Sequence, residues 1–439
     1  MLDVSKNNSF GHKMNSKRNM YFNKNSTRID DLPEDKKNTV RSLILKTITN
    51  GNDHYDNSME GHLFDNLRVF DQNDDGLVLI HFIDNDEKMY TFMSKRVHGI
   101  IIDTKNKCVV ADAMPDTPDI ISEVPITVSK NGNLVYQDKQ IFGDAVLELD
   151  CNAYRFMYAI EGTVMRLFYH NGKWHLSTHK KIDGTRSRWG NSPKFVDIIL
   201  ECVPDFWERV ENFNKNMCYA FMVEHPSTRI VHSSEPKVTL INMFQRTDDG
   251  LMTITPVISY PDYYGFETNC HLRIDTIMRR DLSILPDREI IAYNMNSTGT
   301  SVMSCVKITS SRYAYLKSLR NNEPNLQLRY LVIQRDIKNP QMLADFVELF
   351  NDRVELFDEL IGVDEKVADY LEQCYHIRYS EKKLLTLPSE EHHVLKAIAY
   401  KANRHIIKGN IRDAILDKLM TSNGRQLYSM YKNSKQFTR

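Results

Sequence analysis

YAIEGTVMRLFYHNGKWHLSTHKKIDGTR, residues 158–186, is the segment from which the fold class is inferred. Its middle holds Asn171-Gly172 between two runs that are rich in β-branched and aromatic residues. Asn-Gly favours a type I′ turn, because that turn needs a positive φ at both central residues, and it joins two antiparallel strands. The sequence therefore predicts a β-hairpin here, within strands that span residues 154–178.

Two tetrapeptides of similar form stand at the two ends of this hairpin. The first tetrapeptide is Ile160-Glu161-Gly162-Thr163, and the second is Lys181-Ile182-Asp183-Gly184. Each places a carboxylate directly before a glycine, but only the second has a lysine two residues before its carboxylate. The first opens the hairpin, whereas the second leads into TRSRWGNSPKF, which shows no strand pattern. We therefore favour the first as the functional motif, with Lys180 and Lys181 at the basic end of the return strand.

The bulk composition limits the classes of protein to which this chain can belong. Its 439 residues include 57 Lys and Arg against 58 Asp and Glu, so a nucleic-acid-binding face requires local segregation of charge. The 7 cysteines are scattered without a Cys-x-x-Cys pair, which disfavours a zinc site or a disulfide framework and favours a reducing compartment. Because no run of about 18 apolar residues occurs, we expect a cytoplasmic protein that does not cross a membrane.

Composition divides the chain into three predicted parts. Residues 1–33 are rich in Asn, Lys and Ser and predict a disordered, mildly basic tail. Residues 34–325 predict a domain dominated by strands, and residues 326–439 predict an all-α domain. The elements expected in the middle part are a helix at 34–50, strands within 76–114, 125–150 and 154–178, a helix at 193–210 that Pro204 kinks or splits, and strands at 217–260 and 289–308.

The predicted helical domain changes charge along its length. Its helices at 345–372 are acidic on their polar face, whereas basic side chains predominate from Cys374 onward. The basic helices could bind the phosphates of an RNA stem, because an Arg/Lys-rich face attracts nucleic acid without regard to sequence. They could equally pair with the acidic helices of the same domain, since the two charges are complementary. The sequence leaves both alternatives open.

Several ordered segments together carry a resemblance to a known family. They are RVHGIIID (96–103), AIEGT (159–163), STHKK (177–181), YAFMVEHPSTRIV (219–231), VTLINMFQR (238–246) and SCVKITSSRYAYL (304–316). In this order they resemble the phage-type ATP-dependent RNA ligases, the RNA ligase 1-like family of the covalent nucleotidyltransferases. The resemblance implies an α+β fold, with an antiparallel-sheet nucleotidyltransferase domain of ATP-grasp-like ligase type followed by an all-α C-terminal domain.

The resemblance also implies roles for single residues. In this family a lysine attacks the α-phosphate of ATP, AMP then passes to a 5′-phosphate, and a 3′-hydroxyl finally displaces AMP. ATP and Mg²⁺ are the implied cofactors, and the implied partner is RNA, as strand ends or as a tRNA-like stem. The implied nucleotide contacts are Glu161, Gly162, Glu224, Lys307 and Arg96, the implied RNA contacts are Arg229, Arg186 and Arg188, and the implied metal contact is Glu289.

The sequence departs from this family at the position of the nucleophile. In the favoured register Ala159 stands where the catalytic lysine belongs, and alanine cannot attack a phosphate. In the segment SCVKITSSRYAYL (304–316), Thr309 stands where the family has a second lysine. Ile290, which follows Glu289, stands where the family has a glycine. A substitute nucleophile must then come from the return strand, where Lys180 and Lys181 are the candidates.

Three functions remain open from the sequence. The first is an RNA ligase-like nucleotidyltransferase that acts on RNA ends with ATP and Mg²⁺, with impaired self-adenylylation. The second is a catalytically inactive ligase-fold module, a pseudoenzyme that binds RNA or a protein partner. The third is a capping guanylyltransferase or a DNA-ligase-like enzyme in which Lys181 of Lys-Ile-Asp-Gly-Thr-Arg is the nucleophile, and it requires that Lys181 begin a hairpin.

Overall fold

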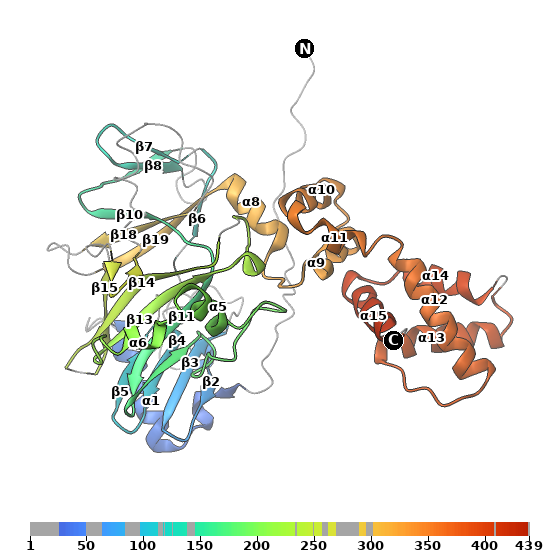
Figure 1. Cartoon of the computed structure of the whole chain (residues 1–439), viewed down its shortest axis with the longest axis horizontal. Coiled ribbons are helices and arrows are strands. Elements are labelled where there is room, and N and C mark those ends of the chain that lie inside the picture. Colours follow the sequence, from blue (N-terminus) through green and yellow to red (C-terminus); the bar gives the residue numbers. More distant parts are fainter. Residues whose placement is uncertain are drawn as a thin grey trace, which may run out of the picture. The chain divides into compact units, whose positions relative to one another are not determined.

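The structure of the chain is a computed structural model that forms two compact units (Figure 1). Unit 1 comprises Met1–Asp116, Phe168–Asp183 and Phe244–Thr253, and unit 2 comprises Thr117–Leu167, Gly184–Met243 and Ile254–Arg439. The described residues are 26–49, 64–83, 97–112, 117, 119–124, 126–137, 145–232, 235–248, 250–256, 262–268, 289–295, 302–407 and 410–437.

Unit 1 is built on an antiparallel sheet with the strand order β1-β2-β3-β4-β5. Helix α1 (Glu34–Thr49) packs on this sheet through Val40, Ile44 and Ile48, which recur at a spacing of four and therefore share one face of the helix. The predicted helix at 34–50 is confirmed. The strands are β1 (Thr27–Arg28), β2 (Leu67–Gln72), β3 (Leu77–Phe82), β4 (His98–Asp103) and β5 (Cys108–Ala111).

The predicted hairpin is present. Strands β11 (Thr163–His170) and β12 (Lys173–Ser177) are neighbours, and Asn171-Gly172 joins them. The φ angles of Asn171 and Gly172 are 47° and 80°, the positive values that a type I′ turn needs. Residues 178–216 are all described and contain no strand before β13 (Met217–Glu224). The first tetrapeptide therefore opens a hairpin, and the second does not.

Unit 2 contains the sheets that carry the late motifs. One has the strand order β10-β18-β19-β6, in which β6 joins β19 in parallel and the other pairs are antiparallel. Another has the order β7-β8-β9. Strand β13, whose residues all belong to unit 2, lies between β11 and β14. The bounds are β6 (Asp119–Ser122), β7 (Thr127–Val128), β8 (Leu134–Gln137), β9 (Val146–Leu149), β10 (Tyr154–Tyr158), β14 (Lys237–Arg246), β15 (Met252–Pro256), β16 (Asp262–Tyr263), β17 (Phe266–Glu267), β18 (Ile290–Met295) and β19 (Val302–Ser310).

Pro204 divides the helix that the sequence predicts at 193–210. The two pieces are α5 (Phe195–Cys202) and α6 (Phe206–Val210), and they are separate because proline has no N–H to continue the helical hydrogen bonds. Phe206 of α6 packs edge-on against Phe221 of β13, with their ring centroids 5.9 Å apart. The helix pair thus has an apolar anchor on the strand that ends at Glu224.

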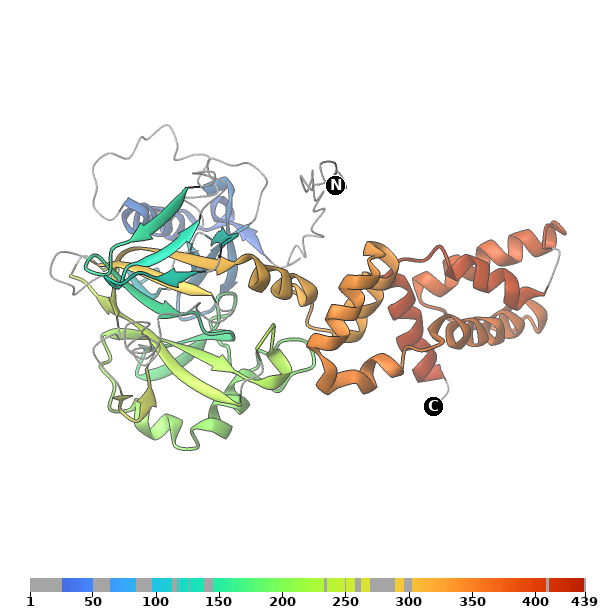
Figure 2. The same cartoon turned by 90° about the horizontal axis from the view of Figure 1, so that it is seen from above.

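From Ser311 onward the described chain is helical, which confirms the α+β class (Figure 2). The side chains of Ser310, Asn325 and Asn339 accept the first orphan N–H groups and so fix where α8, α9 and α10 begin. The helices are α8 (Ser311–Arg320), α9 (Leu326–Val332), α10 (Pro340–Leu349), α11 (Val354–Asp358), α12 (Val363–Tyr375), α13 (Ser389–Asn403), α14 (Ile411–Leu419) and α15 (Gly424–Phe437).

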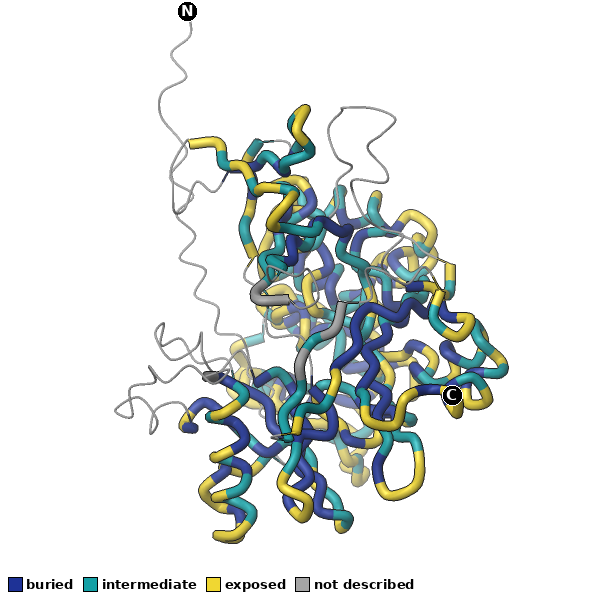
Figure 3. The backbone as a smooth tube through the Cα atoms, turned by 90° about the vertical axis from the view of Figure 1, so that its left-hand side faces the viewer, coloured by how far each residue is buried: buried dark blue, intermediate teal, exposed yellow. Residues whose placement is uncertain are grey.

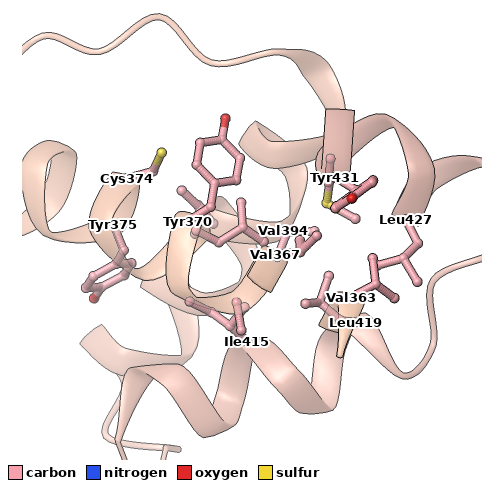
Figure 4. Close-up of a cluster of buried hydrophobic side chains, with 14 of the residues drawn as sticks. Val363, Val367, Tyr370, Cys374, Tyr375, Val394, Ile415, Leu419, Leu427 and Tyr431 are labelled. Atoms are coloured by element: carbon pink, nitrogen blue, oxygen red, sulfur yellow. The ribbon is translucent and has the colours of Figure 1, made fainter. Parts of the chain in front are cut away.

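Helices α12 to α15 close around one apolar core (Figure 4). Val367 of α12, Ile415 of α14 and Leu427 of α15 are fully buried in it. Around this core, Arg412 lies 2.8 Å from Asp369, and Lys435 lies 2.6 Å from Glu359. Basic residues of the last helices therefore do pair with acidic residues of the same region, one of the two arrangements that the sequence leaves open.

Some predictions fall on parts that carry no structural statement. Predictions that fall outside the described residues include Arg96, residues 84–96 of the strands expected within 76–114, and residues 1–25 of the expected tail. The expected domain boundary after residue 325 falls between α8 and α9 and stays a prediction. Buried residues, dark blue in Figure 3, include every residue of β3 and all but the first residue of β4. Among the described helices, none has the length and apolar character needed to cross a membrane.

Candidate functional site

The ends of three neighbouring strands bring the motif positions together. Ala159 directly follows β10, and its N–H donates to the carbonyl of Glu289 at 2.8 Å. Glu289 directly precedes β18, whose Ile291 pairs with Lys307 of β19. Because β10 and β19 flank β18, the ends of three segments far apart in sequence meet at one edge of a single sheet.

The carboxylate of Glu289 is the centre of a small ion network at this edge. Its Oε1 accepts a hydrogen bond from Lys317 Nζ at 2.8 Å and lies 3.7 Å from Lys307 Nζ. Thr309 Oγ1 donates to the same oxygen at 3.3 Å. Glu289 is only 9% exposed, so two ammonium groups compensate a nearly buried negative charge. Lys307 also pairs with Asp119 at 2.7 Å, so the network holds two acids and two bases.

Glu161 of the first tetrapeptide lies in a cradle of hydrogen-bond donors. The N–H groups of Ile230, Val231 and His232 donate to its two carboxylate oxygens at 2.9–3.3 Å. The hydroxyl of Tyr313, on α8, donates to Oε1 at 2.5 Å. These donors occupy the acceptor positions of a carboxylate, which leaves little capacity for a nucleotide or a metal. Glu161 therefore acts here by joining the start of β11 to residues 230–232 and to α8.

Gly162 is required by a close backbone approach. A Cβ at this position would lie 2.6 Å from the carbonyl oxygen of Val223, a distance that only a residue without a side chain tolerates. Val223 precedes Glu224, the half-buried last residue of β13. The glycine of the tetrapeptide thus closes the start of β11 against the end of β13. Glu224 therefore directly follows the residue whose carbonyl oxygen Gly162 approaches, and its nucleotide contact stays a prediction.

Arg229, Arg186 and Arg188 occupy contrasting positions. The side chain of Arg229 is 9% exposed, and its Nη2 donates to Asp352 Oδ1 at 2.6 Å and to the carbonyl of Leu349 at 3.1 Å. Arg186 and Arg188 are exposed in the strand-free stretch before α5. Of the three predicted RNA contacts, the two on this stretch face solvent and Arg229 is held inside the protein. Their RNA role stays a prediction.

Lys180 and Lys181 belong to unit 1. Lys181 Nζ lies 3.8 Å from Asp71 Oδ1, and Lys180 Nζ lies 5.5 Å from the centre of the Phe70 ring. Asp71 Oδ2 also accepts the N–H of Ile182 at 2.9 Å, so this carboxylate fixes the chain just after the lysines. Their catalytic role stays a prediction, as do the nucleotide contacts assigned to Glu224 and Lys307.

Sequence reasoning missed Lys317 and Tyr313 as members of the site. Both lie on α8, which follows β19 without a break. A spacing of four residues puts two side chains on the same face of a helix. From this face Tyr313 contacts Glu161 and Lys317 contacts Glu289. The motif SCVKITSSRYAYL contains Tyr313 and stops one residue before Lys317. Reading it as a strand followed by a capped helix would have found both.

The residues at this edge do not fit a resident metal ion. The carboxylate of Glu289 is bound by ammonium groups, and that of Glu161 is bound by N–H and O–H donors. Among the described residues, no group of three or more His, Cys, Asp and Glu side chains is arranged to hold a metal. The metal contact assigned to Glu289 stays a prediction.

Comparison with known proteins gives distant viral relatives. The chain is 25% identical over 244 residues to the immediate-early protein ICP-46 homologue of Invertebrate iridescent virus 3, which covers 53% of this chain and 51% of the relative. It is 22% identical over 257 residues to ICP-46 of Frog virus 3, covering 52% and 60%. The matches therefore span between half and three fifths of these relatives' lengths. No family model matches the chain.

The chain also matches a solved structure at a low level of structural similarity. It is a protein from Aquifex aeolicus that is provisionally assigned as an ATP-dependent DNA ligase. The match has a TM-score of 0.31 and 12% sequence identity, and it covers 79% of this chain and 88% of the other. At this level of likeness the match carries no conclusion about activity.

Proposed function

We propose that this chain is a ligase-fold module of the nucleotidyltransferase type that binds nucleotide and RNA ends without forming a lysyl-nucleotide. The observation that carries the proposal is the position of Ala159, at the end of β10 and bonded to Glu289. In the RNA ligase-like register this is the place of the nucleophile, and its methyl group has no lone pair to attack a phosphate. The frame of the motif is kept, whereas its reactive atom is missing.

The lysines near this position do not supply a replacement. Lys317 and Lys307 both face the carboxylate of Glu289, and Lys307 also faces Asp119. A lysine attacks only when its amine reaches the phosphorus atom, and these ion pairs hold both amines against carboxylates instead. These two amines are therefore suited to attract the phosphates of a bound nucleotide and unsuited to form a bond with one. ATP is accordingly proposed as a ligand.

The claim that the chain forms no lysyl-nucleotide is tested by a labelling experiment. The purified chain is incubated with α-labelled ATP, and separately with α-labelled GTP, in the presence of Mg²⁺, and then run on a denaturing gel. We expect no covalent label with either nucleotide, in protein whose folding is checked by circular dichroism. A label that disappears in Lys181→Ala or Lys180→Ala would instead show an enzyme with a relocated nucleophile, and the labelled nucleotide would separate ligase from capping chemistry.

The test of the binding half is equilibrium binding of short single-stranded RNA. We expect binding that weakens as salt is raised, because phosphate contacts release counterions. Replacing both Arg186 and Arg188 with Ala should weaken binding, since these arginines are exposed in the strand-free stretch before α5. The matched control is the replacement of Lys382 and Lys383 with Ala, because that pair is also exposed but lies in the helical region. Absence of RNA binding at low salt would contradict this half of the proposal.

A further inference from the structure

A cavity of about 320 Å³ lies within unit 2, away from the strand ends just described. Its lining, as the structure describes it, includes three arginines and no Asp or Glu side chain. We call it the arginine cavity; its members used below are Arg229, Arg320, Arg353, Trp189, Phe350 and Tyr428. A wall that combines cations with aromatic rings is the composition that binds anionic organic ligands.

The positive charge of this cavity is only partly compensated. Arg229 Nη2 lies 2.6 Å from Asp352 Oδ1, and Arg353 Nε lies 3.4 Å from Asp352 Oδ2. One carboxylate thus serves two guanidinium groups. The side chain of Arg353 is 40% exposed, so it can move its remaining donors toward a ligand.

Arg320 adds a third charge that has no carboxylate within ion-pair distance among the described residues. Its guanidinium donates to main-chain carbonyls, those of Arg229, Ser227, Glu323 and Pro324. It also lies 4.3 Å from the centre of the Trp189 ring. Burial, together with repulsion from Arg229, lowers the pKa of Arg320 to about 10, although Glu161 and Glu323 act in the opposite direction. The three arginines therefore repel one another, and an anion in the cavity would relieve that repulsion.

The walls of the cavity are fixed in place before any ligand arrives. Gly190 has a φ of 59°, and a Cβ there would lie 2.7 Å from the Pro324 side chain, so the loop after Trp189 closes tightly on the start of α9. Tyr428 of α15 accepts a hydrogen bond from Asn325 at 2.6 Å. A preformed wall loses little entropy when it binds a ligand.

We propose that the arginine cavity binds a phosphate monoester, as carried by a mononucleotide or by the 5′ end of an RNA strand. Guanidinium groups match the geometry of phosphate oxygens, and the volume lies at the lower end of the range of small-ligand sites. This inference rests on the proposed function, because Arg229 is also one of the predicted RNA contacts, but none of the lining residues belongs to the edge formed by β10, β18 and β19.

Isothermal titration with AMP, adenosine and inorganic phosphate tests the inference on the full chain. We expect AMP to bind, inorganic phosphate to compete with it, and adenosine not to bind. RNA oligonucleotides with a 5′-phosphate and with a 5′-hydroxyl then distinguish the source of the ligand: a preference for the phosphorylated strand identifies strand ends, and binding of AMP alone identifies a mononucleotide. Equal binding of AMP and adenosine would overturn the inference.

Three variants locate the binding. Arg353→Ala should weaken AMP binding about tenfold, since it removes one charged donor pair. Arg412→Ala is the matched control, because it also breaks one partly exposed arginine–aspartate pair, in the helical core region. Asp352→Asn should strengthen AMP binding about threefold, because it removes the carboxylate that competes for two arginines. A damaged fold cannot produce tighter binding. Unchanged AMP affinity in Arg353→Ala and in Asp352→Asn would place the ligand elsewhere and contradict the inference.

Discussion

The two tetrapeptides Ile160–Thr163 and Lys181–Gly184 have nearly the same pattern and very different surroundings. The first lies between β10 and β11, with its carboxylate bonded to residues 230–232 and its glycine closed on β13. The second follows the end of β12, with Lys181 half exposed beside Asp71 and no strand after it. We call the strand before the first tetrapeptide, the hairpin after it and the donors to Glu161 the frame. The tetrapeptide with the lysine lacks this frame, and the tetrapeptide with the frame lacks the lysine.

The structural elements around a short motif, and not its residues alone, distinguish the two tetrapeptides. A carboxylate followed by glycine has a function only where a strand precedes it, a hairpin follows it and remote donors meet it. Glu161 has all three surroundings. Under the function proposed above, these surroundings and the alanine at position 159 belong to a protein that keeps a binding site and has lost a reaction.

The largest expected effect is the difference in unfolding free energy between removing the carboxylate of Glu161 and removing that of Asp183. Glu161→Ala should lower the free energy of unfolding by about 3 kcal/mol, because it leaves partly buried N–H groups and the Tyr313 hydroxyl without their acceptor. Asp183→Ala, the matched change in the second tetrapeptide at an exposed residue, should cost less than about 0.5 kcal/mol. Urea denaturation followed by circular dichroism measures both. Equal losses would erase the distinction between the two tetrapeptides.

A glycine substitution should come next in size. Gly162→Ala introduces a Cβ only 2.6 Å from the Val223 carbonyl, so the start of β11 must shift away from β13. We expect a loss of about 2 kcal/mol of unfolding free energy, in the range of overpacked interior sites. The same urea titration detects it. A neutral result would mean that β11 does not depend on this close approach.

A smaller effect tests the link from Glu161 to α8. Tyr313→Phe removes one donor to Glu161 and should cost about 1 kcal/mol. The matched control is Tyr315→Phe on the same helix, whose hydroxyl bonds to exposed Asp345 and should contribute close to nothing. If both variants have wild-type stability, Tyr313 is not part of the frame.

The smallest effect concerns the hairpin that separates the tetrapeptides. Burial lowers the pKa of both His170 and His175 below the ordinary value of 6.5. The unfolded chain therefore binds protons that the folded chain does not, and the free energy of unfolding should fall as pH is lowered from about 7.5 to about 5.5. His175→Phe, which can keep the stacking on Phe168, should reduce this slope in urea titrations at several pH values. An unchanged slope would exclude His175 as its source.

Much of the fold could be predicted from the sequence because local rules determined it. Asn171-Gly172 determined the hairpin turn, Pro204 determined the break between α5 and α6, and apolar spacing predicted α1. The parallel pairing of β6 with β19 could not be predicted, since it joins segments far apart in sequence and no local signal specifies it.

Residues of the candidate site could be predicted only where they belonged to a recognised sequence motif. Glu161 and Gly162 were expected to contact a nucleotide, whereas their side-chain and backbone contacts are to residues of the same chain. Lys317 lay beyond the quoted motif, and its partner Glu289 became visible only when β18 and β19 paired. Of the arginine cavity, the sequence pointed only to Arg229, because its three arginines come from separate segments that folding brings together.

The most direct test of the central claim is to return the lysine to the frame. Ala159→Lys, Ile160→Lys and the wild type are incubated with α-labelled ATP and Mg²⁺, checked for folding, and compared on a denaturing gel. We predict that only Ala159→Lys becomes covalently labelled, since it places an amine at the end of β10, while Ile160→Lys adds the same amine one residue out of register. A labelled wild type, or equal labelling of the two lysine variants, would contradict the claim that Ala159 marks the lost nucleophile.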